Sequence, residues 1–162
     1  MSKRTKVVLA VIGLLLAIQL FRPSRTNPTI DSTQEIAAVL KVNPGVQAIL
    51  NRSCQDCHSN RTVWPGYSEV APISWLVADD VNSGRRHMNF SEWGTYPSYK
   101  QQDLLNEMCK IVTQRDMPPF TYGLAHAPSR PSEAEREAIC EWTKAAGVEI
   151  AVPQGEAPRT SR

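Results

Sequence analysis

The sequence predicts an all-α domain that follows an N-terminal apolar helix. First, residues 7–21 form an uncharged apolar run that three basic residues precede. Second, apolar residues beyond residue 31 recur at helical spacing, and no long run alternates apolar and polar residues as a half-buried strand would. Third, two Ser-x-x-Glu patterns, which begin at Ser32 and Ser132, are typical of helix starts.

The apolar run predicts an export signal. It holds 15 residues, fewer than the roughly 20 that a bilayer-spanning helix needs, and it matches the apolar region of a signal sequence. A cleaved signal peptide is the alternative, but no small-x-small cleavage site is evident, so we expect 7–21 to be an uncleaved signal anchor or transmembrane segment. The positive-inside rule then makes residues 1–6 a cytoplasmic basic segment and places the rest of the chain in the periplasm.

The charge distribution argues against a nucleic-acid partner. The formal net charge of the 162 residues is +2, and five basic residues without an acidic one lie in residues 1–26. The remainder carries 13 basic and 16 acidic residues, whereas nucleic-acid binding needs a clustered basic face.

The rest of the chain divides into a linker, one domain and a tail. We expect a proline-stiffened linker over 22–31, a domain over 32–150 and a disordered tail over 151–162. A loop with four prolines is expected over 116–131. The apolar spacing predicts helices over 33–42, 46–50, 72–84, 98–114 and 132–147.

The motif that indicates chemistry is Cys54-Gln55-Asp56-Cys57-His58, a C-x-x-C-H pattern. This spacing is the signature of c-type haem attachment. The two thiols bond two vinyl groups on one porphyrin edge, and the histidine becomes the proximal iron ligand. We therefore expect one covalent haem c on Cys54, Cys57 and His58.

Three other interpretations of C-x-x-C were weighed. A thioredoxin-type redox pair needs a βαβ context, for which the sequence has no pattern. A zinc site needs a second pair of ligands at short spacing. A structural disulfide between near neighbours is the third alternative.

Met117 is the expected sixth iron ligand. It lies in Asp116-Met117-Pro118-Pro119, where proline stiffens the loop and removes backbone donors. Methionine opposite histidine also raises the reduction potential. His126 is the second choice, and three further candidates are expected to have other roles, in the core or at the surface: Met88, Met108 and His87.

Other side chains are expected around the haem. Trp64, Tyr67 and Trp75 are expected to wall the haem or to fill the core, because a large apolar plate needs aromatic cover. Arg85 is a candidate partner for a haem propionate, with a solvated surface charge as the alternative.

Cys109 and Cys140 lie on the helices that flank the Met117 loop. In an oxidising compartment a disulfide between them would staple the base of that loop. The alternative is a pair of buried free thiols that behave as small apolar side chains.

Several further motifs carry a resemblance to a known family. The chain resembles the bacterial haem-binding domain family over about residues 20–145, and its order of helices resembles a small class I cytochrome c. The resemblance implies a cytochrome c-like monohaem domain outside the cytoplasmic membrane. Gly66 departs from the pattern, since an aromatic residue is expected there. The matching motifs are Trp64-Pro65-x-Tyr67-Ser68, Ala71-Pro72-x-Ser74-Trp75-Leu76-Val77, Asp80-Val81-x-x-Gly84-Arg85, Asn89-Phe90-Ser91-x-Trp93 and Met117-Pro118-Pro119.

The expected function is one-electron transfer by a cytochrome tethered to a bacterial inner membrane, with its haem domain in the periplasm. Its partners would be redox proteins of a respiratory or oxidase chain, and the protein would be an electron carrier and not an enzyme. The alternatives are a haem-based sensor of a gas or peroxide and a peroxidase-like protein. Both alternatives require an open or displaceable iron position.

Overall fold

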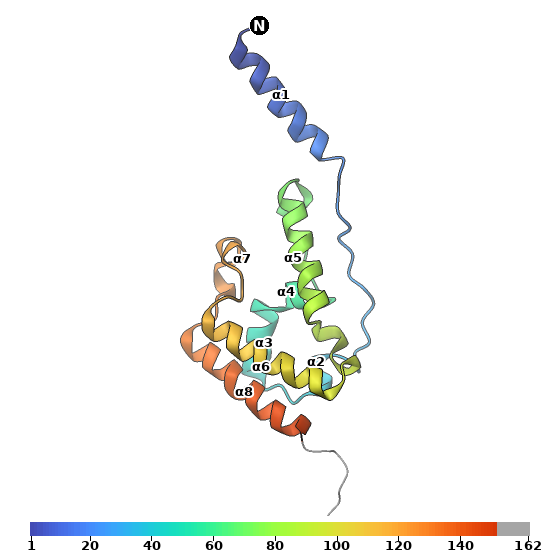
Figure 1. Cartoon of the computed structure of the whole chain (residues 1–162), viewed down its shortest axis with the longest axis vertical. Coiled ribbons are helices and arrows are strands. Elements are labelled where there is room, and N and C mark those ends of the chain that lie inside the picture. The colour runs from blue at the N-terminus through green and yellow to red at the C-terminus, as the bar shows by residue number, and fades with distance from the viewer. Residues whose placement is uncertain (152–162) are drawn as a thin grey trace, which may run out of the picture.

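The computed structural model describes residues 1–151 (Figure 1). Over these residues the chain forms eight α-helices and three short 3-10 helices, without a β-strand. The all-α prediction is therefore confirmed. The last helix includes Ala151, and the rest of the expected tail lies outside the described residues.

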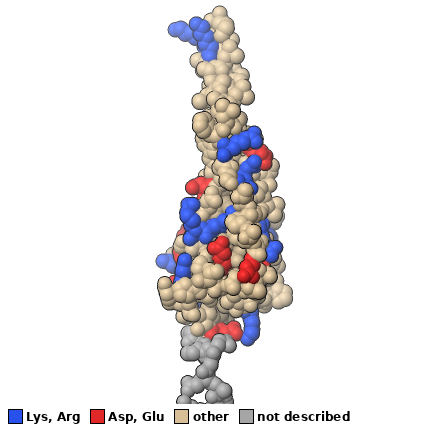
Figure 2. Space-filling model, turned by 90° about the vertical axis from the view of Figure 1, so that its right-hand side faces the viewer, with Lys and Arg blue, Asp and Glu red and all other residues tan. Residues whose placement is uncertain are grey.

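Helix α1 (Lys3–Ile18) projects away from the domain (Figure 1). Ser2 caps it by accepting a hydrogen bond from the backbone N–H of Thr5. Figure 2 shows basic side chains at its tip and then a length of uncharged surface before the domain. Among residues 1–151, no helix combines the length and the apolarity that crossing a membrane requires. The anchor predicted over 7–21 thus gains no support from the structure.

The first predicted capping box is wrong. Instead of a helix over 33–42, the structure has the single turn α2 (Ile36–Val39), and Ser32 caps nothing. The Glu35 carboxylate is not available for a capping box, because both of its oxygens accept hydrogen bonds from Arg61. Asp31 accepts hydrogen bonds from the backbone N–H and the hydroxyl of the next-but-one residue, Thr33.

Helix α3 (Pro44–Ser53) leads into the cysteine motif, and α4 (Gln55–His58) contains most of it. Asn43 caps α3 by accepting a hydrogen bond from the backbone N–H of Val46 at 2.9 Å. Pro44 occupies the first turn, where its missing N–H costs nothing.

Helix α5 (Ile73–His87) packs against α4 and continues past Gly84, which was expected to end it. The 3-10 helix η1 (Gly66–Glu69) precedes α5, and η2 (Phe90–Thr95) follows it.

Helix α6 (Ser98–Gln114) has the bounds that its apolar spacing predicts. The predicted loop over 116–131 contains α7 (Phe120–Ala125) and the 3-10 helix η3 (Ala127–Ser129). Helix α8 (Glu133–Ala151) packs along α6 (Figure 1) and passes through Gly147, which was expected to stop it.

The second predicted capping box is confirmed at the start of α8. The Glu135 carboxylate accepts from the backbone N–H of Ser132 at 2.7 Å, and the Ser132 hydroxyl accepts from the N–H of Glu135 at 3.3 Å.

The main core lies where α3, α6, α8 and η2 meet. Its most deeply buried members are Trp93, Leu105, Ile139, Val46 and Leu50.

The expected linker, residues 22–31, is extended and lies against the domain (Figure 1). We call residues 19–29 the strap, because hydrogen bonds attach it along its length. The Gln19 side chain both donates to and accepts from the backbone of Ala71, at 3.0 and 2.9 Å. Arg25 donates to the carbonyl of Ser68. Asn27 donates to the carbonyl of Thr62, and the carbonyl of Thr29 accepts from Asn60.

Candidate haem site

The C-x-x-C-H motif lies at the junction of two helices. Cys54 is the residue between α3 and α4, and Cys57 and His58 form the end of α4. Because α3 is anchored in the core by Val46, Ile49 and Leu50, the motif starts from a rigid support.

The His58 imidazole is buried and oriented. Its Nδ1 lies 3.1 Å from the carbonyl oxygen of Met88. A carbonyl can only accept, so Nδ1 carries the proton and Nε2 keeps a free lone pair. Burial lowers the pKa of His58, which favours the neutral ring. A neutral imidazole with Nδ1 bonded to a carbonyl is the usual form of a metal-ligating histidine.

A cavity of about 270 Å³ opens beside the motif. We call it the haem cavity. Both cysteines and His58 line it, and so does Met117. The remaining wall is mostly apolar, with these side chains at its centre: Phe90, Met108, Ile111, Val112, Pro118 and Pro119. An apolar cavity with two thiols, one imidazole and one thioether matches the chemistry of a covalently held haem.

Both motif cysteines are free thiols in this structure. Burial raises the pKa of Cys54 and of Cys57 to about 12, so both remain protonated, as a thiol is before it adds to a vinyl group. The alternative interpretation, a local disulfide between Cys54 and Cys57, does not form in this structure. Within residues 1–151, no three His, Cys, Asp or Glu side chains gather to hold a metal ion, so the zinc interpretation gains no support.

The structure separates the candidates for the sixth ligand. Met117 follows α6 and lies at the haem cavity with 36% of its surface exposed. His126 does not line that cavity; its Nε2 lies 2.6 Å from the Tyr67 hydroxyl. His87 lines the cavity, but its Nε2 lies 3.0 Å from the carboxylate of Glu107.

The two other methionines are buried in the cavity wall. Met88 uses its carbonyl to orient His58 and exposes only 4% of its surface. Met108 belongs to the core cluster, as expected, and also lines the haem cavity.

None of the four expected pocket residues lines the haem cavity: Trp64, Tyr67, Trp75 and Arg85. Three of them, Trp64, Trp75 and Arg85, hold the strap instead. The Trp64 indole donates to the Asn27 side chain at 3.2 Å, and the Trp75 indole donates to the carbonyl of Phe21 at 2.6 Å.

Arg85 uses four of its five N–H donors on protein acceptors. It donates to the carbonyls of Ser59 and Thr26, to the Asn27 side chain and to the Thr62 hydroxyl, at 2.7 to 3.0 Å. It therefore joins the strap to the loop after His58, outside the lining of the haem cavity. Tyr67 lines a neighbouring cavity, described below.

Sequence reasoning missed the role of Asp56. Its carboxylate accepts from the backbone N–H of Val63 at 3.0 Å and from the Tyr122 hydroxyl at 2.8 Å. These bonds connect the haem motif to the loop after it and to α7. No sequence signal distinguishes this residue, since either intervening position of C-x-x-C-H accepts many side chains.

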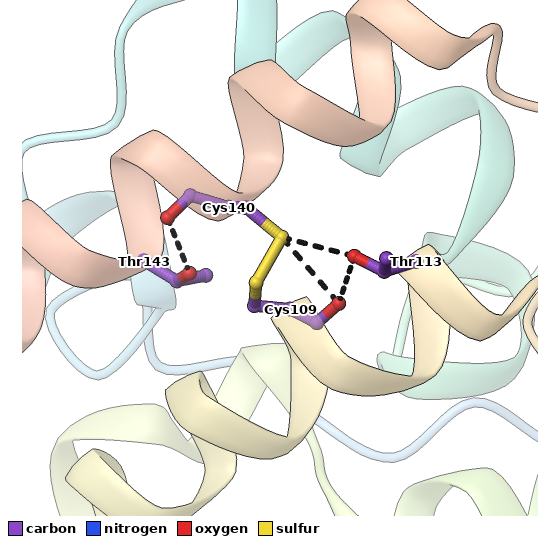
Figure 3. Close-up of a disulfide and its surroundings, with 4 residues drawn as sticks. All are labelled: Cys109, Thr113, Cys140 and Thr143. Atoms are coloured by element: carbon purple, nitrogen blue, oxygen red, sulfur yellow. Dashed lines mark hydrogen bonds between the residues drawn. A yellow bond between two sulfur atoms is a disulfide. The ribbon is translucent and has the colours of Figure 1, made fainter.

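Cys109 on α6 and Cys140 on α8 form a disulfide in the structure (Figure 3). Thr113 lies beside it and donates to the carbonyl of Cys109 at 2.8 Å. The bond connects the two helices between which the Met117 segment runs.

Comparison with known proteins gives one result. No curated protein and no solved structure matches the chain. A family model described as the haem-binding domain matches residues 13–145. That range contains the cysteine motif, the whole haem cavity and the disulfide, and the chain therefore belongs to the haem-binding domain family.

Proposed function

We propose that the protein is a c-type cytochrome that carries one electron at a time. In this proposal Cys54 and Cys57 would hold a single haem through thioethers, and His58 and Met117 would bind its iron. The observation that carries the proposal is that these four side chains, drawn from two separate segments, line one apolar cavity.

The bound haem would supply a one-electron couple at its iron. The chain's own residues do the rest. The carbonyl of Met88 holds the His58 ring by its Nδ1 proton, which keeps Nε2 directed to the ligand position. The apolar wall excludes water, and a methionine ligand stabilises the reduced state. With His58 and Met117 both bound to the iron, no position would be left for a substrate, so we propose an electron carrier and not an enzyme.

We further propose that the domain works in the periplasm, tethered to a bacterial inner membrane by residues 7–21. The uncharged run behind three basic residues supports this. The Cys109–Cys140 disulfide is also typical of an oxidising compartment. Its partners would be redox proteins of a respiratory or oxidase chain.

The test is visible spectroscopy of the exported protein. We expect the colour to stay with the protein through acid–acetone extraction, and to be lost from a Cys54→Ser, Cys57→Ser double variant. We expect the reduced wild type to be low-spin and to bind carbon monoxide poorly. Met117→Ala should become high-spin and bind carbon monoxide readily.

His126→Phe is the matched control, because His126 is engaged by Tyr67 outside the haem cavity. Its spectrum should be that of the wild type. If His126→Phe, and not Met117→Ala, opens the iron, the proposed ligation is wrong. If the wild type binds carbon monoxide freely, a gas or peroxide sensor becomes the better hypothesis.

A further inference from the structure

A second cavity of about 230 Å³ lies next to the haem cavity. We call it the side cavity. It is lined by residues of α5 and of α7. Four residues line both cavities: Asp56, Cys57, Asp80 and Tyr122. His58 and Met117 do not line the side cavity, so it is distinct from the proposed ligand positions.

The walls of the side cavity are mainly apolar. One face of α5 supplies Ile73, Leu76, Val77 and Val81, and Ala125 faces them from the end of α7. Ile73 and Leu76 are half exposed, at 49% and 51%. These two side chains therefore mark an entrance from solvent, while Val81 is buried at the inner end.

The polar groups at the side cavity are mostly engaged with one another. The Tyr67 hydroxyl and His126 Nε2 form a hydrogen bond, and Asp56 accepts from Tyr122 and from the backbone. Asp80 differs, because no ion pair or hydrogen bond from the described residues reaches its carboxylate. Burial, and then the neighbouring Asp79, raise the pKa of Asp80.

The negative charge of the side cavity and its single unengaged carboxylate limit which molecules the cavity can bind. An anion would be repelled by Asp56, Asp79 and Asp80. A buried ammonium group has three N–H donors and needs several acceptors. The side cavity offers it only one carboxylate that is not already hydrogen-bonded, that of Asp80. A hydroxyl group has one donor and satisfies that carboxylate without a new charge.

We propose that the side cavity binds a small neutral ring molecule with one hydroxyl group, of the phenol class. The ring lies against the apolar face of α5, and the hydroxyl donates to the Asp80 carboxylate. This site goes beyond the proposed electron transfer and does not depend on which residue is the sixth iron ligand.

The experiment uses calorimetric titration of the haem-loaded full chain with three matched probes: p-cresol, toluene and benzylamine. We expect p-cresol to bind and toluene to bind about tenfold more weakly, because toluene lacks the hydrogen bond to Asp80. Benzylamine should bind no better than toluene.

Variants locate the site. Val77→Phe and Ala125→Leu fill the side cavity from opposite walls, and each should abolish p-cresol binding. Leu124→Phe is the control, since Leu124 is 67% exposed and lines neither cavity. Asp80→Leu should reduce p-cresol affinity to the toluene value, and Asp79→Leu should leave it unchanged. The far-ultraviolet circular dichroism spectrum and the haem content per protein molecule show that each variant is folded and holds its haem.

Three outcomes would overturn the proposal. The haem-loaded protein could fail to bind p-cresol, which would mean that the haem itself occupies this space. Toluene or benzylamine could bind as tightly as p-cresol. Both filling variants could keep wild-type affinity. None of these results would bear on the electron-transfer proposal, whose test is the spectrum of Met117→Ala.

Discussion

Gly84 on α5 meets the backbone of Cys57 on α4 so closely that a Cβ atom at position 84 would lie 2.5 Å from the Cys57 carbonyl oxygen. Real Cβ atoms essentially never approach an oxygen that closely, and a backbone carbonyl cannot swing away as a side chain can. The absence of a side chain at Gly84 therefore lets α5 cover the haem motif directly.

Gly84→Ala should force α5 away from α4. Overpacking of this kind costs about 1–3 kcal/mol, and here the displaced backbone belongs to the motif. We expect lower stability towards urea and less haem per protein molecule. Gly66→Ala is the control, because nothing lies within 4 Å of a Cβ at that position. Equal haem content in the two variants would contradict the role assigned to this contact.

Tyr122→Phe should loosen the connection between α7 and the haem motif. The variant removes the 2.8 Å hydrogen bond from the hydroxyl to Asp56 and leaves a part-buried carboxylate oxygen without its donor. The expected cost is about 1 kcal/mol in the free energy of unfolding. Tyr99→Phe is the control, since Tyr99 is 72% exposed. The two urea midpoints should differ; coincident midpoints would mean that the Asp56 bond does not stabilise the fold.

The successes of sequence reasoning lie where local pattern decides structure. Helix α6 follows from its apolar spacing, and the start of α8 follows from Ser132 and Glu135. One oxygen of the Glu135 carboxylate accepts from Arg52 and the other stays free for the N–H of Ser132. The same pattern failed at Ser32, because Arg61 occupies both oxygens of the Glu35 carboxylate. Arg61 is 26 residues from Glu35, so no local window could reveal that competition.

The misses at the site have a similar cause. Trp64, Trp75 and Arg85 are of the right chemical type for a haem pocket, but their partners are strap residues far away in sequence. The strap looked like a free linker because its attachments are hydrogen bonds and an ion pair to residues more than 30 positions away, which leave no local pattern in the sequence. By contrast, C-x-x-C-H and Met-Pro-Pro were sufficient to identify four side chains that line one cavity.

Arg85→Ala should detach the strap from the loop that follows His58. It removes donors to four acceptors, among them the carbonyls of Ser59 and Thr26. Hydrogen bonds from a charged group contribute at most about 1.5–3 kcal/mol each, and partial exposure of the group reduces this contribution. We therefore expect Arg85→Ala to lower the free energy of unfolding by about 2 kcal/mol. Arg86→Ala is the control, because Arg86 donates only to the nearby Ser83 hydroxyl.

Limited proteolysis gives a second measurement on the Arg85 variant. Cleavage within residues 19–29 should become faster in Arg85→Ala and stay slow in Arg86→Ala. Equal cleavage rates would show that the other strap contacts, such as Arg25 with Ser68, hold the segment without Arg85.

The Cys109→Ala, Cys140→Ala double variant should lose stability and also change the behaviour of Met117. The disulfide closes a loop with a sequence separation of 31 residues, and cross-links of this size stabilise a fold by about 2–4 kcal/mol. Because that loop contains Met117, the proposed sixth ligand, its opening should let Met117 leave the iron more often. We therefore expect a lower urea midpoint together with faster carbon monoxide binding by the reduced protein. Thiol titration of the denatured, haem-loaded wild type should find no free thiol, since the proposed haem attachment would place two cysteines in thioethers and the other two form the disulfide. A lower midpoint with unchanged carbon monoxide binding would show that the disulfide stabilises α6 and α8 without restraining the ligand loop.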